Sequence, residues 1–307
     1  MVKLQKPLLV IVLGPTAVGK TSVAIALAKK FQTCIISADS RQFYKEIPIG
    51  TAQPSQAELN SVQHYFIADN SIANPIDAGA YGREARKILE HEFQNHSVII
   101  MAGGSGLYID AVVNGFDPLP DADVSIREEL QKTFEEIGIE PLQEELQKLD
   151  PEFCEEIDRN NPSRLIRAIE VCRLTGKKYS ELRVGKTETL PFNVLKIGLD
   201  LPREELYGRI NERVELMMEN GLEKEARSVF AQRKMNALQT VGYKELFDYF
   251  DGTITLERAV ELIRQHSRNY AKRQLTWWRR DAAIIWFKPS EISAVEELII
   301  NNVQITN

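Results

Sequence analysis

The 307-residue sequence predicts an α/β fold in which helices flank a parallel sheet and a helical domain is inserted into the chain. Runs of consecutive apolar residues, which are typical of strands buried on both faces, alternate with stretches of helical periodicity. The first run ends at a glycine-rich loop that leads into a helix. From residue 116 to residue 191, short charged helices separated by prolines replace this alternation. We therefore expect an α/β core in residues 1–115 and 192–307, and an inserted helical domain in residues 116–191.

The first strand and the loop after it carry the clearest chemical signal. Residues 8–13 are all apolar, have no helical period and stop at a glycine, so they predict a buried strand. The loop consists of Gly14, Pro15, Thr16, Ala17, Val18, Gly19, Lys20 and Thr21. It fills every fixed position of the phosphate-binding pattern, in which backbone N–H groups surround an anion, the lysine adds charge and the Thr21 hydroxyl reaches Mg²⁺. A helix beginning near Gly19 points its positive end at the same place. The order of strand, loop and helix predicts a P-loop NTPase-like core that binds a di- or triphosphate, rather than a merely glycine-rich turn.

The second strand is predicted at residues 34–37 and leads into Asp39, Ser40, Arg41 and Gln42. A carboxylate just past the carboxyl end of a parallel strand lies at the edge where such sheets bind ligands. We therefore expect Asp39 close to the phosphate loop. The alternative is that Asp39 caps a helix.

The third predicted strand, residues 97–101, follows a helix expected over residues 78–94 and ends in a glycine-rich turn that contains Ser105. Phosphate-loop kinases and NTPases often carry an aspartate at the end of such a strand to hold magnesium. Here the strand runs into Ala102, Gly103 and Gly104. The standard apparatus for hydrolysis is therefore incomplete.

Charge is distributed unevenly through the predicted helical domain. Residues 117–158 hold fifteen Asp and Glu against three Lys and Arg, whereas residues 159–186 hold eight Lys and Arg against two Glu. A second basic stretch, residues 264–288, holds seven Lys and Arg and interleaves them with Tyr270, Trp277 and Trp278. These stretches predict either an electropositive surface for nucleic acid or ordinary solvated helix faces, with the aromatic residues in the core.

The rest of the chain returns to the α/β pattern. Strands are expected at residues 194–199 and 282–287. Helices are expected from Pro202 past Met217, over 240–250, over 256–278 and over 292–300. The first of these carries Arg209 and Arg213, which are four residues apart and project together.

Composition bounds the class of protein. Apolar residues make up 43% and charged residues 27% of the chain, as in ordinary globular proteins. No apolar run approaches the roughly 20 residues of a membrane span, and the segment before the first strand is too short for a signal peptide, so we expect a cytoplasmic protein without a membrane partner. The three cysteines form no CxxC pair, so neither a disulfide framework nor a cysteine zinc site is indicated.

Eight motifs occur together along nearly the whole chain. They are GPTAVGKT (14–21), ADSRQFY (38–44), IGTAQP (49–54), GGSGLY (103–108), NPSRLIRAIEV (161–171), RINERV (209–214), TVGYKE (240–245) and KRQLTWWRR (272–280). In this order they resemble the bacterial tRNA dimethylallyltransferases, also called tRNA isopentenyltransferases. The phosphate loop alone is shared with many families, whereas DSRQ, GTA-x-P and KRQ-x-TW in this order are far more specific.

The resemblance implies an activity and roles for particular residues. Members of that family transfer the dimethylallyl group of dimethylallyl diphosphate to N6 of adenosine-37 in tRNAs that read codons beginning with U, which gives N6-dimethylallyladenosine. By resemblance, Asp39 is the general base, and Thr21 and Arg213 stabilise the diphosphate. The implied contacts to the tRNA anticodon stem-loop are Asp39, Ser40, Arg41, Gln42, Ser105, Arg127, Ser163, Arg164, Leu165, Ile166, Arg167, Gln239, Thr240, Val241, Gly242, Tyr243 and Lys244. Mg²⁺ is the expected cofactor, and a monomer is expected.

Two residues depart from the pattern of that family. Ser105 replaces the usual threonine and keeps the hydroxyl, whereas Gln53 replaces the usual lysine and removes a positive charge, which predicts weaker affinity.

Two other functions are compatible with the phosphate loop. A small-molecule kinase could use the same loop for ATP, although the missing acid after Met101 argues against it. The non-enzymatic alternative is an RNA-binding protein with a regulatory phosphate loop.

Overall fold

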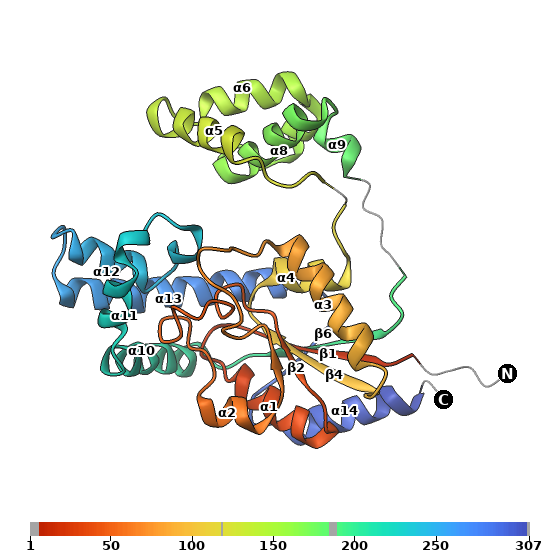
Figure 1. Ribbon diagram of the computed structural model, residues 1–307. Helices are drawn as coiled ribbons and strands as arrows, with labels where there is room; N and C mark the ends of the chain where they lie inside the picture. Colours follow the sequence, from red (N-terminus) through yellow and green to blue (C-terminus); the bar gives the residue numbers. More distant parts are fainter. Residues whose placement is uncertain (1–5, 118, 184–188, 306–307) are drawn as a thin grey trace. The chain divides into compact units, whose positions relative to one another are not determined.

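The computed structural model describes residues 6–117, 119–183 and 189–305 (Figure 1). It divides into two compact units. The sheet unit comprises the described residues up to Val113 and from Thr189 onward, and the helical unit lies within Asn114–Glu188. The two edges lie two and three residues from the boundaries expected from the sequence.

The sheet unit is built on six parallel strands in the order β3-β2-β4-β1-β5-β6. Their bounds are β1 Leu8–Leu13, β2 Ile35–Ser37, β3 His64–Tyr65, β4 Val98–Gly103, β5 Asn193–Leu199 and β6 Ile284–Phe287. Five of these strands were predicted. The sequence did not predict β3, because two residues are too few to show a period.

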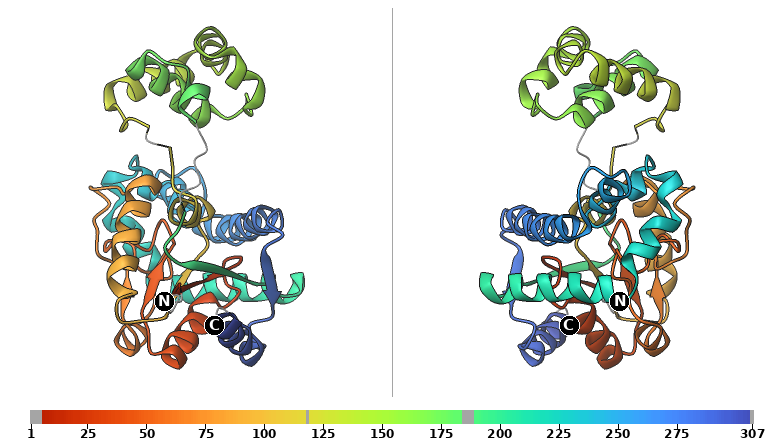
Figure 2. Two further views of the ribbon diagram at one scale, coloured as in Figure 1. Left: turned by 90° about the vertical axis from the view of Figure 1, so that its right-hand side faces the viewer. Right: turned by 90° about the vertical axis from the view of Figure 1, so that its left-hand side faces the viewer.

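Helices cover both faces of this sheet (Figure 2). They are α1 Lys20–Phe31, α2 Gln56–Ser61, α3 Ala78–Glu92, α4 Gly106–Val113, α10 Arg203–Glu219, α11 Leu222–Ser228, α12 Tyr243–Phe250, α13 Leu256–Trp278 and α14 Ile292–Ile305, with short 3₁₀ turns η1 Phe230–Gln232 and η2 Asn236–Leu238. Alternate residues of β1 point to opposite faces: Leu9 and Ile11 belong to the apolar core that contains residues of α3, α4 and α12, whereas Val10 and Val12 belong to the core that contains residues of α1 and α14. Since both faces are covered, β1 is apolar at every position.

Two predicted helix starts differ from the structure. The helix expected from residue 240 begins at Tyr243, because Gly242 has a φ of +101°, which a right-handed helix does not allow. The Glu245 carboxylate accepts a hydrogen bond from the Gly242 N–H at 2.8 Å and caps the helix there. Pro202 precedes α10 as its N-cap instead of lying in its first turn.

The helical unit contains α5 Val124–Glu136, α6 Glu140–Leu149, α7 Pro151–Glu156, α8 Pro162–Thr175 and α9 Tyr179–Leu182, and no strand among its described residues. The side chains of Asp123, Asp150 and Asn161 cap three of these helices. A separate apolar core holds the unit together and includes Leu130, Leu142, Leu146, Phe153 and Ile169. Because this core belongs to the unit alone, the inserted residues form a compact body of their own.

The described residues include no helix with the length and apolarity that a bilayer span requires. Cys34, Cys154 and Cys172 are all buried as free thiols. Cys34 packs in the core beside β2.

Candidate active site at the carboxyl edge of the sheet

The loop after β1 exposes an unusual number of backbone donors. Gly14, Ala17 and Gly19 adopt φ values of +146°, +64° and +106°, which curl the chain before α1. Among the described residues, the N–H groups of Ala17, Gly19, Lys20 and Thr21 have no hydrogen-bond partner, whereas Val18 N–H bonds to Pro15 O at 3.4 Å. Four unpartnered donors at the positive end of a helix form a site for an anion.

Lys20 lies against this loop. Its ammonium group donates to the carbonyl oxygens of Gly14 and Pro15 at 3.1 and 2.8 Å. Burial lowers the pKa of Lys20 to about 8, an effect that the charge of Asp39 opposes and that of Arg213 reinforces. An anion on the loop would favour the charged form of this side chain.

Arg213 reaches the same loop from α10. Its Nη1 donates to the hydroxyl of Thr16 at 3.2 Å. Burial lowers the pKa of Arg213, and the nearby charge of Asp39 opposes that shift. Arg209, one turn earlier, pairs with Glu205 at 2.9 Å on the exposed part of the helix. Of these two arginines, Arg213 alone has a hydrogen bond to the phosphate loop among the described residues.

Asp39 lies two residues beyond β2. Its Oδ1 accepts a hydrogen bond from the Arg41 N–H at 3.0 Å, so it closes a turn and does not cap a helix. The turn rests on an aromatic cluster, in which Phe43 stacks on Tyr81 with 5.4 Å between ring centroids. Tyr81 also donates a hydrogen bond from its hydroxyl to Ser37 O at 2.9 Å, so this cluster holds the end of β2 in place.

A cavity of about 40 Å³ opens at this edge of the sheet. Its polar lining includes Lys20, Thr21, Ser37, Asp39 and Gln42. Its apolar lining includes Ala24, Ile35, Pro54, Ile67 and Ala102. Phosphate-binding groups and a carboxylate therefore line one cavity together with apolar surface.

A larger hollow of about 280 Å³ lies near the opposite, amino ends of β1 and β5, beside Lys6 and Asn193. We place the site at the smaller cavity, because it adjoins the anion-binding loop and the ligand-binding edge of a parallel sheet.

The turn after β4 is joined directly to the Asp39 turn. Ser105 Oγ accepts from the Ser40 N–H at 3.0 Å and contacts the Ser40 hydroxyl at 3.2 Å. Gly103 leaves no room for a side chain, since a Cβ atom there would collide with Ala38 O. The serine that replaces the usual threonine therefore uses its hydroxyl to hold two loops together.

No carboxylate follows β4, and the described residues contain no group of three or more His, Cys, Asp or Glu side chains arranged to hold a metal. Thr21 and Asp39 nevertheless line the same cavity. Mg²⁺ is commonly held by one or two protein oxygens together with substrate phosphates. The residues present fit a magnesium ion bound in that way.

Gln53 has a structural role that was not expected from the sequence. Its side-chain amide donates to the carbonyl oxygens of Gln42 and Tyr44, both at 2.9 Å. In return, the Gln42 amide donates to Thr51 O and Ala52 O at 3.2 and 3.0 Å. Gln53 therefore braces the Asp39 turn with donors that need no charge, and the weaker affinity expected from the missing lysine stays a prediction.

The segment 239–244 divides into exposed and buried residues. Gln239 and Lys244 are exposed, whereas the side chain of Tyr243 is completely buried. The Tyr243 hydroxyl donates to Glu225 at 2.5 Å, and the same carboxylate accepts from the N–H groups of Ile49 and Gly50 at 2.8 Å. Tyr243 therefore supports the 49–54 loop, and its expected contact with RNA through the side chain is incorrect.

In the helical unit, the predicted contact residues also divide. Ser163 and Arg164 are exposed, whereas Leu165 and Ile166 are buried in the core of the unit and cannot contact RNA through their side chains. The expectation for these two residues was wrong because a motif does not distinguish the two faces of a helix.

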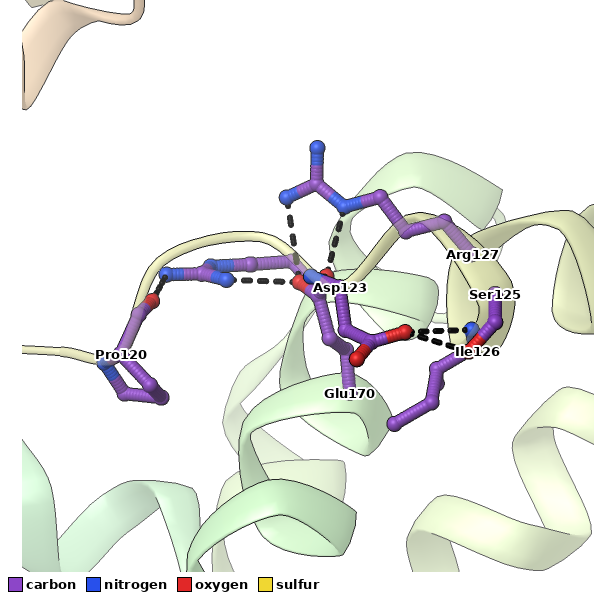
Figure 3. Close-up of polar contacts among 7 residues, drawn as sticks. Pro120, Asp123, Ser125, Ile126, Arg127 and Glu170 are labelled. Atoms are coloured by element: carbon purple, nitrogen blue, oxygen red, sulfur yellow. Dashed lines mark hydrogen bonds and ion pairs between the residues drawn. The ribbon is translucent and has the colours of Figure 1, made fainter.

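Arg127 and Arg167 both bind one buried carboxylate, Glu170 (Figure 3). Arg127 binds it through Nε and Nη2 at 2.8 and 3.0 Å, and Arg167 binds it through Nη1 at 2.6 Å. The Asp123 N–H also donates to Glu170 at 2.8 Å. Two guanidinium groups therefore face the carboxylate of Glu170, and the carboxylate of Asp123, which caps α5, lies in the same cluster. The Arg127 side chain is 46% exposed, so part of its guanidinium group faces solvent.

The three aromatic residues near the end of α13 divide between the core and the surface. Trp278 is buried in the core, whereas Tyr270 and Trp277 are exposed. Trp277 lies against Gly106 at the start of α4, and the charges of Asp39 and Arg41 act on the Tyr270 hydroxyl. Two of the three aromatic residues are therefore available beside the turns that form the site.

Comparison with known proteins agrees with this geometry. The sequence model of the family described as IPP transferase matches residues 42–281. The tRNA dimethylallyltransferase of Cytophaga hutchinsonii is 48% identical over 290 residues, covering 94% of this chain and 95% of the relative. The tRNA dimethylallyltransferase of Christiangramia forsetii is 49% identical over 285 residues, covering 93% of this chain and 94% of the relative.

Solved structures give the same result. The full-length tRNA isopentenylpyrophosphate transferase of Bacillus halodurans matches with a TM-score of 0.73 and 35% identity, covering 98% of each chain. A eukaryotic dimethylallyltransferase acting on tRNA matches with a TM-score of 0.73 and 26% identity, covering 88% of this chain and 69% of that chain. On the extent of these matches, the chain belongs to the IPP transferase family.

Proposed function

We propose that this protein is a tRNA dimethylallyltransferase, which moves the dimethylallyl group of dimethylallyl diphosphate to N6 of adenosine-37 in tRNAs that read codons beginning with U. One observation carries the proposal in chemical terms. Four unpartnered N–H groups and Lys20 form an anion site, and Asp39 lines the cavity beside it. Diphosphate departure and deprotonation of an amine need these two groups next to each other.

The anion site would act on the leaving group. As the bond between C1 of the prenyl group and the diphosphate oxygen breaks, its electron pair passes to the diphosphate. Donors that are already oriented stabilise that charge without reorganising. The backbone donors of the loop, Lys20 and Arg213 fill this role, and Arg213 is held in place by Thr16. When bound, Mg²⁺ would be held by Thr21 with diphosphate oxygens and would neutralise part of the same charge.

Asp39 would act on the nucleophile. The lone pair of an adenine N6 amine is delocalised into the ring, so the amine becomes an adequate nucleophile only when a base accepts its proton as the new C–N bond forms. The Asp39 carboxylate is fixed by the Arg41 N–H and faces the cavity. The adenine must leave the stack of the anticodon loop to reach it.

We assign RNA contacts to the exposed or partly exposed members of the predicted set. These are Asp39, Ser40, Arg41, Gln42, Ser105, Arg127, Ser163, Arg164, Arg167, Gln239, Thr240, Val241 and Lys244. Phosphate contacts from the arginines would position the RNA, and the turns beside Asp39 would meet the extruded base. We also propose that the protein acts in the cytoplasm, as a monomer.

A kinase is not favoured. Strand β4 ends at Gly103 and has no carboxylate after it to hold the magnesium of ATP. In prenyl transfer the diphosphate is a leaving group, and no water has to be positioned to attack phosphorus. The absence of that acid is therefore expected for prenyl transfer.

The test is mass spectrometry of tRNA incubated with the protein, Mg²⁺ and dimethylallyl diphosphate. We expect one adenosine to gain a single five-carbon unit. A phosphorylated product that requires ATP, or bound tRNA of unchanged mass, would contradict the proposal.

The variant Asp39→Asn tests the role of Asp39 as general base in the same assay. Asparagine keeps an oxygen that can accept from the Arg41 N–H, so the turn should remain, but it cannot take the proton. We expect turnover to fall by a factor of about 10² to 10⁴, with tRNA binding retained. Near-normal turnover would exclude Asp39 as the base.

A further inference from the structure

Gln274 is a buried polar side chain near the C-terminal end of the charged helix α13. Its neighbours on α13, Lys272 and Arg273, are exposed, but Gln274 itself is only 6% exposed. A buried amide is stable only where its donors and acceptor find partners. The partners of Gln274 lie far away in the sequence.

Both ends of the Gln274 amide bind turns of the active site. Its Oε1 accepts from the Thr16 N–H at 2.8 Å, and its Nε2 donates to Gly104 O at 3.0 Å. A Cβ atom at position 104 would meet Gln274 Nε2, so a larger residue there would have to displace the amide. One side chain therefore joins the phosphate loop to the turn that follows β4.

Thr16 is consequently held at two points by the C-terminal half of the chain. Its backbone N–H donates to Gln274, and its hydroxyl oxygen accepts from Arg213. The next residue, Ala17, has a φ of +64°, which is costly for an alanine and must be maintained by its surroundings. With Thr16 fixed, the loop keeps the curl that leaves the later N–H groups without partners.

We infer that Gln274 is a positioning residue of the diphosphate site: from α13 it holds the phosphate loop in its anion-binding shape, without contacting the anion. This inference rests on the proposed function, because it assumes that the loop holds the diphosphate. It predicts that loss of the Gln274 amide weakens diphosphate binding and leaves tRNA binding unchanged.

Calorimetric titration of the full chain with inorganic pyrophosphate and Mg²⁺ tests the inference. Gln274→Met keeps the length of the side chain but removes both hydrogen bonds, and Gln274→Glu keeps the acceptor but removes the donor. Gln265→Met makes the same chemical change at an exposed position of α13 and serves as the control. The Kd for tRNA and the KM for dimethylallyl diphosphate are measured for each variant.

We expect Gln274→Met to raise the Kd for pyrophosphate roughly tenfold or more, since a buried N–H loses its partner, and to raise the KM for dimethylallyl diphosphate in parallel. The Kd for tRNA should change less than about twofold, and Gln265→Met should match the wild type. Gln274→Glu should also bind pyrophosphate more weakly, because its carboxylate faces Gly104 O and adds negative charge beside the site.

Three results would overturn the inference. The first is wild-type pyrophosphate affinity in folded Gln274→Met. The second is an equal loss of pyrophosphate and tRNA affinity, which would indicate general damage to the fold. If Gln274→Met does not fold, wild-type affinity in Gln274→Glu is the third. Failure of the wild-type protein to bind pyrophosphate would instead refute the proposed function.

Discussion

Arg213 shows how one residue of this site can be tested against a close neighbour. It donates to Thr16, whereas Arg209 on the same helix pairs with exposed Glu205. We expect Arg213→Ala to lower kcat by about a hundredfold, because a donor aimed at the departing diphosphate is lost. Steady-state kinetics and tRNA binding should show this loss without a matching loss of tRNA affinity. Arg209→Ala should retain nearly full activity, and equal loss in the two variants would contradict the assignment.

The lowered pKa of Lys20 predicts how the affinity for the diphosphate depends on pH. Its pKa in the free protein is lowered to about 8, and a bound anion favours the protonated form. Affinity for dimethylallyl diphosphate should therefore be greatest below pH 8 and should fall as the pH rises above 8, by at most about tenfold per unit. Titration between pH 7 and 9.5 measures this. Lys20→Arg stays charged across that range, so its affinity should change little, and an equal slope in both proteins would exclude Lys20 as the cause.

At this scale, the sequence predicts the residues whose motif is local. The phosphate loop is one continuous stretch, and Asp39 directly follows a strand, so both could be placed near each other without coordinates. Gln274 and Glu225 could not be assigned a role, because their partners lie 258 and about 175 residues away. The KRQ motif contained Gln274, but no rule of periodicity says which loop a buried amide will join.

Among the elements, α8 supports the most specific prediction. Its Glu170 is completely buried against Arg127 and Arg167, whereas Glu145 of α6 binds Arg173 where both side chains are about 30% exposed. Glu170→Gln should lower the free energy of unfolding of the helical unit by about 2 kcal/mol, because two guanidinium groups lose a buried anion, although they can still reach water.

Glu145→Gln is the matched control, with an expected change below about 1 kcal/mol. Urea denaturation followed by circular dichroism compares the two variants. The same destabilisation in both would show that the burial of Glu170 has no special effect on stability.

Elements were predicted well where their pattern was long. The start and end of α13 match its predicted range because apolar residues recur over its whole length. The predicted α12 began three residues too early, since the conformation of Gly242 depends on the capping contact with Glu245. The expected RNA contacts at Leu165 and Ile166 failed for a similar reason, because the buried face of α8 is defined by helices α5 and α6 packed against it.

On the scale of the whole molecule, the phosphate site is assembled from both ends of the chain. The loop after β1 supplies the donors, while α10 and α13, more than 190 residues later, supply Arg213 and Gln274. The division into two units was visible in the sequence as a change of pattern. The dependence of the phosphate loop on α10 and α13 was not visible in the sequence, because it arises only when the folded sheet brings these segments to one edge.

The insertion between β4 and β5 also has a consequence for biosynthesis. Strand β1 pairs with β4 on one side and β5 on the other, yet β5 begins at Asn193, ninety residues after β4 ends at Gly103. At about 5–20 residues per second, a ribosome needs roughly five to twenty seconds to make that interval. Throughout it, the nascent polypeptide carries an apolar strand with one unpaired edge, a template for aggregation. Release of a chain truncated within the insertion would leave that edge permanently open.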